Sequence, residues 1–136
     1  MSRSYKTGTD PQLAACVARH IAARPTLLQE ESMIVCIIEY GVRPGMEERL
    51  SQAFAGLVPE IEAVDGFISM DNFQSQTRPG VMLELSYWRD EHALHQWIDN
   101  AAHRGVMPLG RNEIFSWYRI YSTEVKRQID WTPRAP

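Results

Sequence analysis

The chain has 136 residues, a length at which one domain with a single hydrophobic core is expected. Its 14 Lys and Arg against 17 Asp and Glu give a formal net charge of −3, which argues against a nucleic-acid partner, because a phosphate backbone attracts basic surfaces. The longest aliphatic run, residues 33–38, is far shorter than the roughly 20 apolar residues that cross a bilayer, and no apolar signal segment follows the N-terminus. We therefore expect a cytoplasmic protein with no membrane partner.

The first predicted element is a helix over residues 10–24. Asp10 followed by Pro11 is a typical helix start, because the aspartate side chain accepts from free amides and proline is tolerated in the first turn. Pro25 then ends the helix. Residues 1–32 are accordingly interpreted as a helical extension and linker that precede the main domain.

The main domain is predicted to span residues 33–127, followed by a tail over 128–136. It begins with an Ile- and Val-rich run at 33–42 that favours a buried strand. A helical spacing of apolar residues follows over 46–64, and we expect Pro59 to kink this helix or to end its regular part.

Two strand-length runs, 67–74 and 81–88, flank a turn at 75–80 and predict an antiparallel hairpin. Side chains alternate along a strand, so residues 81–88 divide into two faces. One face carries Val81, Leu83, Leu85 and Tyr87, and the other carries Met82, Glu84, Ser86 and Trp88. The sequence does not decide which of the two faces the helices.

A second helix is predicted to start after Asp90, with an apolar side formed by Ala93, Leu94, Trp97, Ile98 and Ala101. Residues 102–112 contain Pro108 and Gly110 and indicate a loop or a broken helical segment. A long strand at 113–127 completes the domain, with one face expected to carry Phe115, Trp117, Tyr121 and Val125.

The resulting order, β-α-β-β-α-β, favours a ferredoxin-like α+β fold with a four-stranded antiparallel sheet and both helices on one face. The opposite face would be aromatic and aliphatic. Such a face is usually covered, and a second copy of the same chain is the simplest cover, so we expect a homodimer.

Several short motifs resemble the antibiotic biosynthesis monooxygenase (ABM) domain family. They are Arg43-Pro44-Gly45, Asp65-Gly66-Phe67, the stretch 86–91 leading to Trp97, and His103-Arg104, Gly110-Arg111 and 118–127 after it. The resemblance implies that two ferredoxin-like subunits pair into a dimeric α/β barrel. It also implies a pocket between sheet and helices, in which some members oxygenate deprotonated aromatic substrates with dioxygen and without metal or flavin.

The resemblance places candidate pocket residues in this chain. Trp88 falls on a pocket tryptophan of those oxygenases, Glu84 on their asparagine, and Leu94 on their tyrosine. In the haem-degrading members a helix tryptophan falls on Trp97, but their ligand histidine falls on Met107, so haem is not expected. We predict no cofactor and no metal.

The candidate catalytic residues are Glu84 and His103, since a buried carboxylate serves as a general base when desolvation raises its pKa towards neutrality. The candidate substrate-binding residues are Trp88, Trp97, Arg104 and Arg111. His92, His95 and Asp99 have the spacing of a metal site but are better explained as a solvated helix surface.

Two functions follow from these candidates. The first is a cofactor-independent monooxygenase acting on an aromatic or quinone-like small molecule. The alternative is a non-catalytic protein that binds a hydrophobic small molecule, or haem, in the same pocket.

Overall fold

The computed structural model describes residues 32–135, so the predicted helix at 10–24 lies outside the described residues. From residue 32 to 126 the chain forms one compact unit. Its elements are β1 (Ile34–Val42), α2 (Glu47–Glu62), β2 (Phe67–Gln74), β3 (Val81–Trp88), α3 (Glu91–Ile98), α4 (Ala101–Leu109), the π-helical turn η1 (Gly110–Ile114) and β4 (Phe115–Glu124). None of the described helices combines the length and the apolar character needed to traverse a lipid bilayer.

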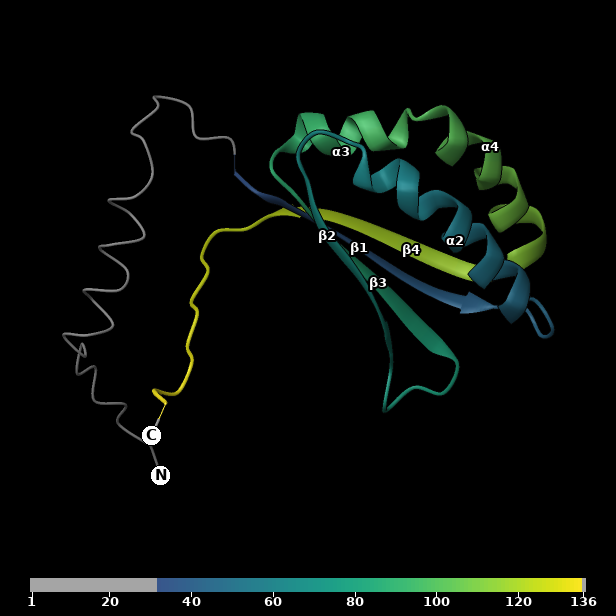
Figure 1. The fold of residues 1–136 in the computed structure, drawn as a ribbon. Coiled ribbons are helices and arrows are strands. Elements are labelled where there is room, and N and C mark those ends of the chain that lie inside the picture. Colours follow the sequence, from purple (N-terminus) through teal and green to yellow (C-terminus); the bar gives the residue numbers. More distant parts are fainter. Residues whose placement is uncertain (1–31, 136) are drawn as a thin grey trace. The chain divides into compact units, whose positions relative to one another are not determined.

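The four strands form one antiparallel sheet in the order β2-β3-β1-β4. The helices α2, α3 and α4 all lie on the same side of this sheet (Figure 1). This is the predicted ferredoxin-like α+β fold, and the predicted hairpin has the same bounds as β2 and β3.

The hydrophobic core lies between the sheet and the helices. Trp88 is its largest member and is fully buried, and it packs with the other core residues Ile34, Cys36, Ile61, Ala93, Leu94 and Trp97. Helix α3 is positioned over this core by Asp90, whose side chain accepts a hydrogen bond from the Ala93 N–H at 2.8 Å.

Two details of the helices bear on the expectations. Of the two alternatives for Pro59, an end of the regular helix is not observed, because α2 continues to Glu62, where the burial of Ile61 in the core holds the last turn in place. Helix α3 ends at Ile98, and the Asn100 side chain caps the separate helix α4 by accepting from the N–H groups of Ala102 and His103. Ile98, the last residue of α3, and Ala101, the first residue of α4, are both exposed and do not form part of the apolar side.

A β-bulge at the start of β4 changes which side chains share a face. Gly41 pairs with Trp117 but Val42 pairs with Phe115, so Ser116 is an extra residue on the β4 side. Phe115 therefore faces the helices, with its ring centroid 5.2 Å from that of Tyr40. The prediction that Phe115 shares a face with Trp117 is wrong for this reason.

Glycine is required at the bulge. A Cβ atom at position 41 would lie 2.6 Å from the indole nitrogen of Trp117 and 2.8 Å from the Ser116 hydroxyl oxygen.

No helix between residues 32 and 126 covers the other face of the sheet (Figure 1). Large aromatic side chains stand there with much of their surface exposed: Trp117 is 40% exposed, Tyr121 46% and Phe73 50%. Aliphatic side chains of β3, Leu83 and Leu85 among them, continue the same face. We call this face, defined by Phe73, Leu83, Leu85, Trp117 and Tyr121, the open sheet face.

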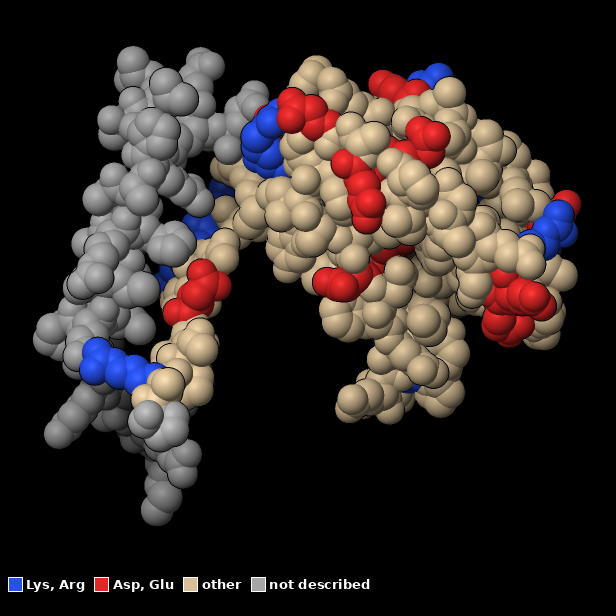
Figure 2. Space-filling model, viewed as in Figure 1, with Lys and Arg blue, Asp and Glu red and all other residues tan. Residues whose placement is uncertain are grey.

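Charged side chains are spread over the outer surface of the helical layer, mostly as separate acidic groups (Figure 2). Glu47 and Glu48 contribute from the first turn of α2. Several of the basic side chains pair with neighbouring carboxylates, as Arg49 does with Glu113 at 2.6 Å and Arg104 with Asp99 at 2.6 Å.

Candidate active site

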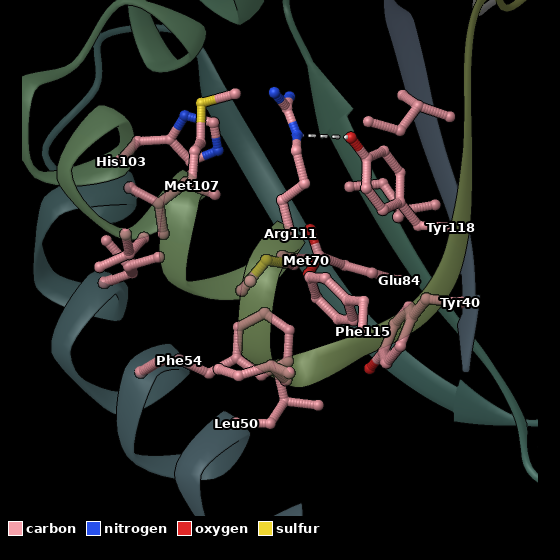
Figure 3. A pocket seen from close by; sticks show the side chains of 18 of the residues that line it. Tyr40, Leu50, Phe54, Met70, Glu84, His103, Met107, Arg111, Phe115 and Tyr118 are labelled. Carbon is pink, nitrogen blue, oxygen red and sulfur yellow. Dashed lines mark hydrogen bonds between the residues drawn. The ribbon is translucent and has the colours of Figure 1, made fainter. Parts of the chain in front are cut away.

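A cavity of about 230 Å³ lies between the sheet and the helices α2 and α4. Its walls are mostly aliphatic and aromatic, with a few polar groups among them (Figure 3). The lining residues are contributed by every strand, by three helices and by η1: Ile38, Tyr40, Leu50, Ala53, Phe54, Leu57, Ile61, Met70, Glu84, Trp97, His103, Val106, Met107, Gly110, Arg111, Ile114, Phe115, Tyr118 and Ile120. Cavities of this composition are typical sites for small hydrophobic ligands.

Glu84 enters this cavity from the middle of β3. Its strand neighbours are Ile38 on β1 and Asn72 on β2. The alternation of β3 puts Glu84 on the side of the sheet that bears the helices, and Ser86 and Trp88 follow on the same side. The question that the sequence leaves open is thus decided: Met82, Glu84, Ser86 and Trp88 form the helix-facing set.

The environment of Glu84 favours the neutral carboxylic acid. Burial raises the pKa of Glu84 to about 7. Within residues 32–135 no hydrogen bond and no ion pair reaches its carboxyl group, so desolvation is not offset by a cation. At neutral pH the Glu84 carboxyl group is therefore protonated in part of the molecules and ionised in the rest. A group that exchanges a proton readily at the working pH is an effective general base.

Tyr40 lies next to Glu84 in the cavity wall and is 2% exposed. Burial, followed by the negative charge of Glu84, raises the pKa of the Tyr40 phenol to about 12. The phenol stays protonated and donates a hydrogen bond to Oδ1 of Asn72 at 3.4 Å. Tyr40 is consequently a fixed neutral wall of the cavity and not a second base.

The rings of His103 and Trp97 contact each other at the α3–α4 junction in a tilted arrangement. Their ring centroids are 4.7 Å apart, with an interplanar angle of 43°. Nδ1 of His103 lies 3.4 Å from the Ile98 carbonyl oxygen, which can only accept, so Nδ1 carries the proton and Nε2 is left as an acceptor. Burial lowers the pKa of His103 and favours the neutral imidazole.

Arg111 brings a positive charge to the cavity from η1. Its Nε donates a hydrogen bond to the Tyr118 hydroxyl oxygen at 3.2 Å (Figure 3). Tyr118 is held in turn by β4 and by an edge contact with Phe115, whose ring centroid is 6.0 Å away. The predicted residues Glu84, Trp97, His103 and Arg111 are thus brought together at one cavity.

Two predicted binding residues do not line this cavity. Trp88 is 0% exposed and lies in the core, where its indole N–H donates to the Ser86 hydroxyl at 2.9 Å and its ring contacts Phe67 at 5.3 Å. The side chain of Arg104 is 64% exposed and is paired with Asp99. Trp88 shares a face with Glu84 as predicted, but it lies under α3, whereas the cavity lies under α2 and α4.

The remaining candidates have structural explanations. Leu94, which falls on the pocket tyrosine of the resembling oxygenases, is buried in the core. His92, His95 and Asp99 are all exposed, with His92 next to Gln96 and His95 next to Glu91. Among residues 32–135 no three His, Cys, Asp or Glu side chains are grouped as metal ligands would be.

Sequence reasoning missed Tyr40, Met70 and Tyr118 as cavity residues. Tyr40 lies within an apolar strand run that favours a core position, and no motif in the sequence distinguishes Met70. Tyr118 could have been found from strand alternation, because it lies on the face of β4 opposite to Trp117 and Tyr121.

Comparison with known proteins supports membership of one protein family. The family model described as antibiotic biosynthesis monooxygenase matches residues 33–108, more than half of the chain. The match begins just before β1 and ends within α4, so it includes Glu84, Trp97 and His103.

Individual relatives agree with this match. A protein of Pyricularia oryzae named jasmonate monooxygenase ABM is 33% identical over 97 residues, which are 71% of this chain and 45% of that protein, so this chain matches less than half the length of that relative. A conserved protein from Methanosarcina mazei has a TM-score of 0.64 at 21% identity, covering 73% of this chain and 98% of its own. SnoaB, a cofactor-independent oxygenase from Streptomyces nogalater, has a TM-score of 0.62 at 10% identity, covering 72% and 97%. At these identities the two structures show a shared fold.

Proposed function

Because the chain belongs to the antibiotic biosynthesis monooxygenase family, we propose that it oxygenates an aromatic or quinone-like small molecule with dioxygen, without metal or flavin, in the cavity around Glu84. The observation that carries this proposal is the carboxyl group of Glu84 in an apolar cavity, where burial raises its pKa to about 7 and no cation of residues 32–135 pairs with it. The names of the P. oryzae relative and of SnoaB support a monooxygenase role.

In the proposed reaction Glu84 first removes a proton from an acidic phenol or from the activated CH₂ group of a phenolic ring system. The resulting anion transfers one electron to dioxygen, and the substrate radical and superoxide combine into a peroxide at carbon. Cleavage of the O–O bond leaves one oxygen atom on the substrate as a carbonyl. The other leaves as water with two hydrogens of the substrate: the proton that Glu84 removed and then returns, and the hydrogen of the carbon that carried the peroxide. Substrate and dioxygen thus give a quinone-type product and water.

The other cavity residues support these steps by position. Aromatic and aliphatic walls, among them Phe54, Phe115 and Ile120, exclude water and so protect the substrate anion from reprotonation by solvent. Trp97 and the neutral His103 form one wall, where a ring system would stack and Nε2 of His103 would accept a hydrogen bond from a substrate hydroxyl.

Dioxygen uptake tests this proposal. With a panel of hydroquinones and anthrones, the protein should consume dioxygen faster than a protein-free control, and added chelator should not change the rate. Isotopically labelled dioxygen should place one oxygen atom in the product. If ligands quench tryptophan fluorescence but no dioxygen is consumed with any of them, the protein is a binding protein instead.

We also propose that the protein is a homodimer formed through the open sheet face. Replacing Trp117 with Lys should raise the dimer dissociation constant roughly tenfold or more, since burial of one such aromatic contributes on the order of 2 kcal/mol per copy. Sedimentation equilibrium measures this constant. Ile98→Lys is the matched control, because Ile98 is 39% exposed on the helical side and Trp117 is 40% exposed on the open face. A monomeric native protein, or equal effects of the two variants, would contradict the interface.

A further inference from the structure

The cavity carries its two opposite charges in different places. Glu84 enters from the middle of the sheet, whereas Arg111 enters from η1 beside the edge strand β4. In the view of Figure 3 the side chain of Arg111 extends away from Glu84, and its Nε lies beside the Tyr118 hydroxyl. A ligand that fills this cavity therefore meets a carboxyl group at one point and a cation at another.

We propose that the ligand is a hydrophobic monoanion whose carboxylate is bound by the guanidinium of Arg111 and the hydroxyl of Tyr118, with its apolar body directed along the cavity towards Glu84. The inference rests on the proposed function only in using the same cavity, and it narrows the substrate class from any aromatic compound to an aromatic or alicyclic acid.

Arg111 has no carboxylate partner, as Arg43 and Arg119 also have none, but it alone of the seven arginines between residues 32 and 126 lines the cavity. Four of them pair with carboxylates: Arg49 with Glu113, Arg78 with Glu39, Arg89 with Asp65 and Asp90, and Arg104 with Asp99. Within residues 32–135 Arg111 makes one hydrogen bond, through Nε to a neutral phenol. Its terminal N–H groups are thus available for a ligand, and a guanidinium matches the two oxygens of a carboxylate.

Tyr118 completes the anion site. Its hydroxyl oxygen accepts from Arg111, so its own hydrogen is left to donate to the ligand. The phenol also restrains the long arginine side chain at one nitrogen, which reduces the loss of side-chain freedom on binding. Both residues line the cavity, so an anion held by them remains in contact with its apolar wall.

The placement of Glu84 sets the orientation of such a ligand. Burial already disfavours the negative charge of Glu84, and a ligand carboxylate beside it would add a second negative charge. The ligand carboxylate is therefore directed to Arg111. The hydroxyl or activated carbon of the ligand then lies at the Glu84 end. Arg111 is accordingly a specificity residue that decides which end of the molecule is presented to the base.

The test compares an acid with its own ester. The probes are 1,4-dihydroxy-2-naphthoic acid and its methyl ester, titrated without dioxygen by tryptophan fluorescence or calorimetry. The native protein should bind the acid roughly tenfold or more tightly than the ester, the range expected for a charge-assisted pair. Arg111→Met should remove this preference by weakening the acid alone, and Tyr118→Phe should reduce it in part.

Arg104→Met is the matched control, because it removes the same charge from a nearby side chain that does not line the cavity. It should leave both dissociation constants unchanged. Equal affinity of the native protein for acid and ester, or equal weakening of both by Arg111→Met, would overturn the anion site. If the ester is also oxidised as fast as the acid, the oxygenase proposal stands and the anion site fails. If the acid binds tightly but no dioxygen is consumed, the anion site stands and the oxygenase fails.

Discussion

Replacing Glu84 with glutamine should lower the rate of dioxygen consumption by roughly 100-fold or more, which is the usual contribution of a positioned general base. Glutamine has almost the same shape and remains neutral, so the cavity and the fold should be preserved. The rate constant for turnover is measured with the best substrate of the panel, and ligand binding by fluorescence. Glu48→Gln, on the exposed first turn of α2, is the control and should be fully active.

The pH dependence of the native enzyme should follow the same group. A general base acts when it is deprotonated, so kcat/KM should rise with pH and reach half of its maximum near pH 7, where Glu84 titrates. A flat profile across this region, or Glu84→Gln retaining most of the native rate, would remove Glu84 from the mechanism.

Glu84→Gln should also stabilise the protein at high pH. The pKa of Glu84 is raised from 4.5 to about 7 by burial in the folded chain. Between these values the folded state binds more protons than the unfolded state, so the free energy of unfolding falls as pH rises. The ionised Glu84 carboxyl therefore destabilises the native protein most above about pH 7. The size of the pKa shift corresponds to a loss on the order of 3 kcal/mol in the free energy of unfolding.

Urea unfolding of native and Glu84→Gln protein, at one protein concentration, measures this effect. The two should have similar free energies of unfolding near pH 4.5, where the folded native carboxyl is already protonated. Glu84→Gln should be the more stable above about pH 7. Comparing the two proteins cancels the titration of all other groups, and Glu48→Gln should follow the native curve. A variant less stable than the native protein at high pH would show that the Glu84 carboxylate has a stabilising partner.

A residue that is both destabilising and essential to the proposed chemistry is expected at an active site. Filling position 84 with an apolar side chain would suit the core better, because an unpaired carboxyl in an apolar wall costs free energy. The core beside it already shows this preference, with Trp88 fully buried four residues further along the same strand face. The free-energy cost of burying the Glu84 carboxyl group therefore arises at a place where a ligand can reduce it by donating a hydrogen bond.

Local pattern by itself determined the order of the elements. Apolar periodicity, the Asp90 cap and the turn at 75–80 predicted the βαββαβ order and the bounds of the hairpin, because each depends on residues close together in the sequence. The same alternation placed Glu84 and Trp88 on one face. The resemblance of a few short motifs then indicated the family that the comparison confirms.

Only the tertiary structure decided which groups meet. Alternation cannot say which face of β3 lies under the helices, nor that the path of α3 buries Trp88 while α2 and α4 leave a cavity at Glu84. The bulge opposite Gly41 placed Phe115 on the cavity side, and the break at Asn100 starts a separate helix that sets His103 against Trp97. Each of these outcomes depends on contacts between segments far apart in the chain, and the burial that raises the pKa of Glu84 exists only once those segments have packed together.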